Sequence, residues 1–137
     1  MDARKLFYGD IVKNHNWILR FQGISSRNGD QYALYLDPDS PVSGVMAMLE
    51  DPSIMPVDIT PEFLRKNNFE QFEGLEGREC WSHKGTGILL RKGRFTFWDL
   101  DIEVGDIDLR WDVQWVHQIQ AAMRLIGSVD HALSLHV

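Results

Sequence analysis

The first sixty residues alternate apolar and polar positions in short runs, a period that is typical of β-strands. In "WILRFQGI" the side chains of Trp17, Leu19 and Phe21 recur at every second position and would share one face of a strand. "SRNGD" then supplies a turn, and "QYALYLD" follows as a second run with strand character. This pattern predicts a β-hairpin.

Three further runs have the composition of strands: "LFYGDIV" before this hairpin, and "GVMAMLE" and "SIMPVDI" after it. A proline-rich loop at residues 37–41 and a turn at Asp51-Pro52-Ser53 separate them. Five short strands so close together leave no room for crossover helices. Residues 1–59 are therefore predicted to form an SH3-like antiparallel β-barrel.

The segment "TPEFLRKNNF" predicts a short helix after the barrel. Thr60 is a good N-cap, and Asn67 or Asn68 can take the left-handed conformation at the other end. Residues 60–73 are predicted to form this linking helix and a loop, and the glycines of "EGLEG" mark the boundary between two lobes.

The second lobe is predicted over residues 78–127. "RECWSH", "GILLRK", "RFTFWDLDIEV" and "IDLRW" have strand character and are joined by tight turns. In "WDVQWVHQIQAAMRLIG" the apolar residues recur at helical spacing, and Gly127 ends this predicted helix. The tail of residues 128–137 fits a frayed end, a last strand or a contact with a second subunit. The whole chain, residues 1–137, is thus expected to be one α+β domain: a barrel, a short helix, and a small antiparallel sheet packed by a C-terminal helix.

Composition and charge narrow the class of protein. A chain of 137 residues with 44% hydrophobic residues is long enough for one sizeable core. Cys80 is the only cysteine, which excludes an intrachain disulfide and a zinc site of several thiolates. The start of the chain shows neither a secretory signal nor a membrane span, so a cytoplasmic location is expected. A net charge of −6 argues weakly against general binding to nucleic acid.

Two segments, "VDITPEFLRKNNF" and "WVHQIQAAMRLIG", carry a resemblance to a known family. The chain resembles an uncharacterised group of small bacterial and phage proteins with an "IPLTEEILLKNGF"-like helix and a closing "VHQLQNLY"-like helix. It departs from the group's pattern at Asn68 and at residues 121–123. The resemblance implies the order of elements and an origin in a phage or mobile element, but no substrate. The matching positions are Ile59, Thr60, Glu62, Leu64, Asn67, Phe69, Val116, His117, Gln118, Gln120, Leu125 and Gly127.

Three polar residues of the last helix form the first candidate site. His117, Gln120 and Arg124 lie close together on a helical wheel and could surround an anion or another polar ligand. The favoured interpretation is structural: these side chains flank the apolar stripe and hydrogen-bond to neighbouring backbone. A single histidine without a placed acid or nucleophile is poor support for catalysis.

The acidic strand "DLDIEV" is the second candidate. Asp99, Asp101 and Glu103 fall at period two and would share one face, where carboxylates could hold Mg²⁺ or Mn²⁺ with His83 as a further ligand or base. Alternating acidic and apolar residues are also typical of a half-solvated strand, which is the favoured interpretation.

Basic residues around the second lobe's hairpins form the third candidate, with Trp81, Phe95 and Phe97 between them. Such a mixture can bind phosphates and stack on bases. Because the next segment is as acidic as this one is basic, intramolecular pairing explains the pattern more simply. The residues are Arg78, Lys84, Arg91, Lys92 and Arg94.

No catalytic constellation stands out, and aromatic residues are plentiful, with Trp, Tyr and Arg being the types that anchor interfaces. We therefore expect a non-catalytic intracellular adaptor or inhibitor that binds another protein, with no cofactor and no membrane. Two alternatives stay open. One is a nucleic-acid-binding module that uses residues 78–97, and the other is a metal-dependent hydrolase that uses the acidic strand. Self-association is a further open possibility.

Overall fold

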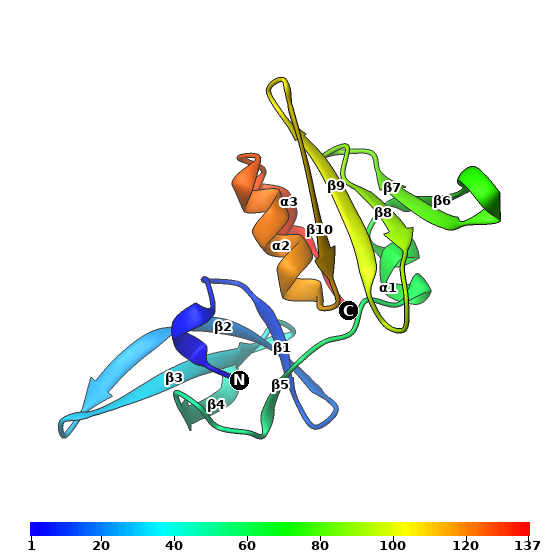
Figure 1. Cartoon of the computed structure of the whole chain (residues 1–137). Helices are drawn as coiled ribbons and strands as arrows, with labels where there is room; N and C mark the ends of the chain where they lie inside the picture. Colours follow the sequence, from blue (N-terminus) through cyan, green and yellow to red (C-terminus); the bar gives the residue numbers. More distant parts are fainter. The chain divides into compact units, whose positions relative to one another are not determined.

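The structure, a computed structural model, describes all residues from Met1 to Val137. The chain forms two compact units, Met1–Val57 and Asp58–Val137 (Figure 1). Each unit contains a five-stranded antiparallel sheet, and in the second unit one α-helix precedes the sheet and two follow it. The predicted α+β class is confirmed. The single-domain organisation stays a prediction, and each unit is described by itself.

The first unit contains a short 3₁₀ helix and five strands. The predicted hairpin is present: its turn lies at Asn28 and Gly29, which both have the positive φ that such turns need. The strands follow the sheet order β4-β3-β2-β1-β5. The elements are η1 (Ala3–Lys5), β1 (Ile11–Asn14), β2 (Trp17–Arg27), β3 (Asp30–Asp37), β4 (Ser40–Met48) and β5 (Ile54–Pro56).

The core of the first unit lies on one face of this sheet. Leu19 and Phe21 of β2 pack with Ala33 and Tyr35 of β3, and Ala3 of η1 joins them. The closed barrel predicted for residues 1–59 is wrong, because β4 and β5 lie at opposite edges and no pairing joins them. β5 has only three residues and ends at a proline, which has no N–H to donate, so it offers little ladder for closure.

The second unit is a meander of strands in the order β10-β9-β8-β7-β6 with three α-helices. Two of its elements differ from the prediction: β6 lies in the segment expected to be the linking helix and loop, and α3 lies in the tail, for which a last strand but no helix was considered. The elements are α1 (Pro61–Lys66), β6 (Phe69–Glu73), η2 (Leu75–Gly77), β7 (Glu79–His83), β8 (Leu89–Lys92), β9 (Trp98–Val104), β10 (Ile107–Val113), α2 (Val116–Leu125) and α3 (Val129–Ser134).

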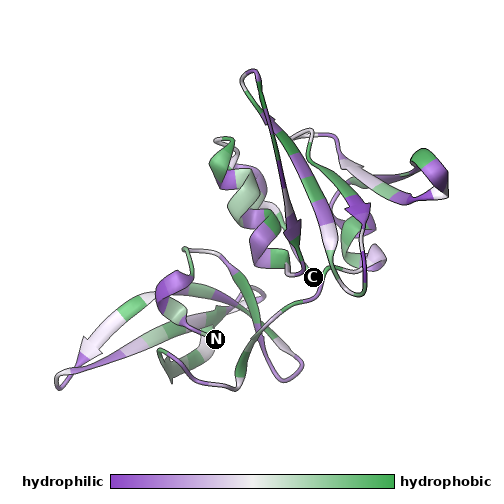
Figure 2. Cartoon of the chain, in the orientation of Figure 1, coloured by the Kyte–Doolittle hydropathy of each residue, from purple (hydrophilic) through white to green (hydrophobic).

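One face of the second sheet is buried. On β9, Trp98, Leu100 and Ile102 are almost fully buried, and they alternate with charged residues of the other face. Hydrophobic and hydrophilic residues alternate along the strands in the same way in Figure 2. α2 and α3 lie side by side against this unit's sheet in Figure 1, and α2 contributes the buried Ile119 and Met123.

Polar side chains hold the helices of this unit in place. Thr60 Oγ1 accepts the N–H of Phe63, 3.1 Å away, as an N-cap should. The buried Asn67 connects α1 to the C-terminal tail, because its amide donates to the carbonyl of His136 and accepts that residue's N–H, at 2.7 and 2.9 Å. The tail is therefore part of the fold.

Candidate functional site

The outer face of the second sheet gathers two of the predicted sets of residues. In the strand register Arg91 lies opposite Asp99, and Arg110 lies opposite Asp101. Directly opposed residues of an antiparallel pair share a face. The acidic strand and the basic hairpins, for which the sequence favoured intramolecular pairing, therefore share a face.

Ion pairs join them. Arg78 pairs with Asp99, and its Nε also donates to the carbonyl of Lys92 at 2.7 Å. Asp101 lies between two arginines, with its Oδ2 3.3 Å from a terminal nitrogen of Arg91 and 3.1 Å from Nε of Arg110. The result is a mixed-charge surface in which arginine and aspartate neutralise one another.

Two carboxylates on this face also influence each other. The hydrogen bond from Arg78 lowers the pKa of Asp99. Asp112, opposite Asp99 on β10, has a raised pKa because it shares a hydrogen bond with that ionised neighbour. These groups line an open pocket of about 440 Å³ together with Leu75 and Trp111. Its lining also includes Arg91 and Arg110, so three arginines and two aspartates face this pocket.

The remaining basic residues of the third candidate site lie in different surroundings. Lys84 Nζ lies 2.7 Å from a carboxylate oxygen of Glu70. Lys92 lies over the ring of Trp98, 4.5 Å from its centroid. Arg94 is exposed in the loop before β9. Intramolecular pairing thus accounts for most of the cationic cluster, and no continuous strip of unpaired cations forms.

The structure brings together no group of three His, Cys, Asp or Glu side chains that could hold a metal ion. Glu103 is exposed near the end of β9. His83, which was considered as a further ligand or base, is buried, with its Nδ1 2.9 Å from the hydroxyl of Thr86 and its ring edge-on to that of His131. Burial and the neighbouring His131 lower the pKa of His83, so it is neutral near pH 7.

The polar residues of α2 take different positions. Gln120 is fully buried and its amide donates to the carbonyl of Ala132 in α3, 2.9 Å away. Gln118 accepts the N–H groups of Gln114 and Trp115 and so caps the start of α2. His117 and Arg124 are partly exposed. For His117, Gln120 and Arg124, both the favoured structural role and the alternative ligand cluster stay predictions.

The outer face of the first sheet is very different. Leu34 of β3 lies opposite Met46 of β4, and Tyr32 lies opposite Met48, so these residues form an apolar patch. Met46 and Met48 are 49% and 70% exposed, although inward-facing Ala47 between them is buried. We call Tyr32, Leu34, Met46 and Met48 the apolar patch.

The patch borders a strand edge that lacks the usual protection. Natural proteins blunt edge strands by charge, proline or shortness, since an open edge invites pairing with other chains. β5 is short, while β6 carries two glutamates and β10 carries Asp108, Arg110 and Asp112. β4 spans nine residues, Ser40–Met48, and none of them is charged. Its only proline, Pro41, stands near the beginning.

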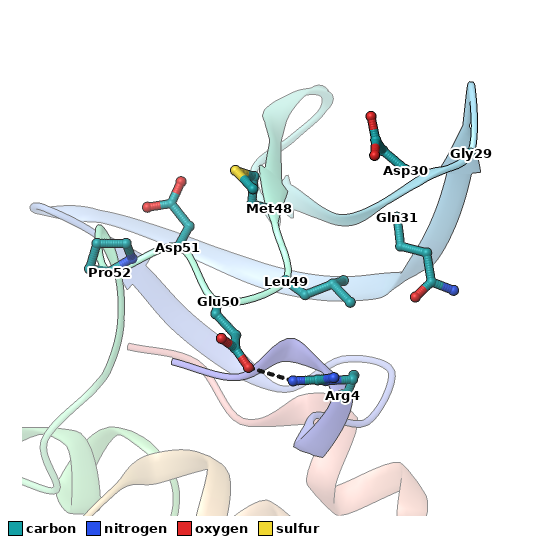
Figure 3. Close-up of a pocket in the computed structure, with 9 residues that line it drawn as sticks. All are labelled: Arg4, Gly29, Asp30, Gln31, Met48, Leu49, Glu50, Asp51 and Pro52. Atoms are coloured by element: carbon teal, nitrogen blue, oxygen red, sulfur yellow. Dashed lines mark hydrogen bonds and ion pairs between the residues drawn. The ribbon is translucent and has the colours of Figure 1, made fainter.

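An open pocket of about 670 Å³ lies where β4 ends (Figure 3). Met48 and Leu49 contribute apolar surface to it, and Asp30, Glu50 and Asp51 contribute carboxylates. The side chains of Arg4 and Glu50 point toward one another and form an ion pair, whereas the carboxylates of Asp30 and Asp51 point away from that pair. The pocket continues the surface of the patch and adds negative charge.

Sequence reasoning recognised the strands that carry the patch but not the patch itself. "QYALYLD" has apolar residues on both of its faces, whereas a strand with one solvated face normally has polar residues there. That signal could have been read from the letters. Which of the two faces is solvated was unknown until the strand order was known.

Comparison with protein-family models, with curated proteins and with solved structures finds no match to this chain. No helix in the structure has the length and apolar character that crossing a bilayer requires.

Proposed function

We propose that this protein is a non-catalytic binding module that acts, as an adaptor or inhibitor, by binding another protein through β4 and the apolar patch. The observation that supports this most strongly is the combination of an uncharged, nine-residue edge strand with exposed methionines beside it. An exposed edge of this kind is an aggregation hazard unless something pairs with it. A binding partner would explain why the hazard is retained.

The chemistry of the patch fits protein recognition. Methionine is flexible and polarisable, and it is used often on surfaces that bind other proteins. Full burial of one such side chain contributes roughly 1.5 to 3 kcal/mol. On the outer face of the second sheet, by contrast, ion pairs occupy the centre of β8, β9 and β10. The first unit is therefore the better candidate for the binding function.

The test is affinity capture with matched bait variants. Met46 on β4 and Met55 on β5 are 49% and 50% exposed, so Met46→Lys and Met55→Lys make the same change at equal exposure on opposite edges. Proteins captured from native lysate by the unaltered chain should be lost with Met46→Lys and kept with Met55→Lys. The captured protein is then purified and titrated calorimetrically against all three baits.

Circular dichroism should show that both variants are folded, because each substitution lies on the surface. Equal binding by all three baits would place recognition away from β4 and overturn the proposal. Retention of a nucleic acid in place of a protein, with loss in Arg91→Glu, would favour the alternative at residues 78–97.

A further inference from the structure

The free side of β4 has a geometry that accepts another strand. Residues 44–48 pair with β3 along one side. Outside the helices and the strand ladders, the backbone hydrogen bonds involve no residue of this stretch apart from the Met48 carbonyl, which accepts the N–H of Asp51 in a turn. The outer N–H and C=O groups of this stretch therefore point to solvent, where an incoming strand can pair with them.

Side chains along β4 alternate between two environments. Gly44, Met46 and Met48 face outward, and Val45 and Ala47 face the core. No side chain fits at Gly44, because a Cβ there would lie 2.1 Å from the carbonyl oxygen of Tyr35. A strand added beside β4 would place every second side chain next to the exposed methionines. Those side chains must be apolar to gain from the contact.

The acidic residues around β4 indicate which charge the ends of an incoming segment should carry. No lysine or arginine occurs between Arg27 and Arg65, whereas acidic residues flank β4 on both sides. Asp37 and Asp39 precede it, and Glu50 and Asp51 follow it. Hydrogen bonds from Trp17 and Ser53 lower the pKa of Asp37 and Asp51 respectively, so both are ionised at neutral pH.

Positive groups near the end of β4 offset only part of this negative charge. Arg4 pairs with Glu50 and also with Asp2, so one cation serves two carboxylates. The hydrogen bonds from Ser53 contribute more to the lowered pKa of Asp51 than the N-terminal ammonium does. Both ends of β4 therefore attract positively charged groups, while the strand itself has no charged side chain.

The same charges disfavour a second copy of this chain as the occupant. Twofold pairing of β4 with itself is antiparallel, which brings Asp39 of one copy toward Asp51 of the other. Like charges placed opposite each other in a sheet are destabilising. A different protein with the opposite charge fits better.

We infer that β4 accepts, by strand addition, an extended segment of another protein that carries apolar side chains at alternate positions and lysine or arginine at both ends. This inference rests on the proposed function and specifies the chemistry of its partner. Pairing with residues 44–48 needs a segment of about 17 Å, or five residues at roughly 3.4 Å each.

Synthetic peptides test the inference on the full chain. One peptide has alternating valine and threonine flanked by lysines, and its matched control has glutamates in place of the lysines. Nuclear magnetic resonance of the ¹⁵N-labelled chain locates binding, and fluorescence anisotropy measures affinity. We expect amide shifts at residues 44–48 and an affinity about tenfold higher for the lysine peptide, with the difference reduced by salt.

Variants separate the two parts of the recognition. Met46→Lys should abolish binding, and Asp39→Lys should remove most of the preference for the lysine peptide. Glu103→Lys makes the same charge change on the exposed end of β9 and should alter neither result. Circular dichroism of each variant distinguishes lost binding from lost folding.

The outcomes distinguish this inference from the proposed function. Equal affinity for both peptides, shifts outside residues 44–48, or no peptide binding while a captured protein still depends on Met46 would overturn the inference and leave the proposed function standing. If the binding of neither the peptides nor any captured protein depends on Met46, the inference and the proposed function are both wrong.

Discussion

The two sheets of this protein have the same number of strands and the same antiparallel pairing, yet their outer faces differ. In the second sheet the outer face is charged, and Asp101 alone engages both Arg91 and Arg110. In the first sheet the outer face exposes Leu34 and Met46, next to an edge without charge. A face whose polar groups bind one another needs no partner, whereas an exposed apolar face beside an open edge gains free energy when it is covered.

The largest expected effect is a change in the free energy of unfolding when one leucine from each sheet is replaced by alanine. Leu100→Ala removes a fully buried side chain from β9 and should lower the free energy of unfolding by about 2 to 5 kcal/mol. Leu34→Ala changes a side chain of the patch that is 38% exposed and should cost about 1 kcal/mol or less. Chemical denaturation measures both. Equal losses would mean that the patch is part of a core.

A smaller effect is expected from pH in the first unit. Tyr35 is fully buried, its hydroxyl has no hydrogen-bond partner within the protein, and burial raises its pKa from 10.0 to about 12. The folded state holds this proton more tightly than the unfolded chain. The stability it contributes is complete below pH 10 and is lost as the pH rises from 10 toward 12, by about 2 to 3 kcal/mol at most.

Tyr35→Phe provides the control for this titration. Because the hydroxyl has no partner to lose, the variant should be as stable as the parent at pH 7. It should also lose less stability than the parent between pH 10 and pH 12, as measured by thermal melting. Parallel curves for the two proteins would contradict the assignment to Tyr35.

The smallest effect tests the paired surface of the second sheet. Asp101→Asn weakens contacts with two arginines and should cost about 1 kcal/mol, since Arg110 is largely exposed and solvent screens its charge. Glu103→Gln, two residues along the same strand, should change stability by less than about 0.5 kcal/mol. Denaturation at low and high salt measures both, and the cost of Asp101→Asn should shrink in high salt. Equal effects would show that the pairing adds nothing.

Local patterns predicted most of the elements. The Asn28-Gly29 turn, the cap at Thr60 and the helix before Gly127 could be read from neighbouring residues, because each depends on contacts within a few positions. The barrel failed because closure depends on β4 meeting β5, a contact between distant segments. β6 and α3 were missed because their short sequences lack a strong period, and they are ordered by the neighbours they pack against.

The candidate sites show the same division. The letters alone identified the acidic period of Asp99 and Asp101 and the cluster of arginines, since charge and spacing belong to the sequence. The adjacent segments of opposite charge also favoured intramolecular pairing, but only the register of β8, β9 and β10 showed which residues lie opposite one another. The sequence also contains an uncharged run from Ser40 to Met48 with acids on both sides. Only the tertiary structure made this run an edge, because the position of a strand in its sheet is decided by long-range pairing, which no local pattern encodes.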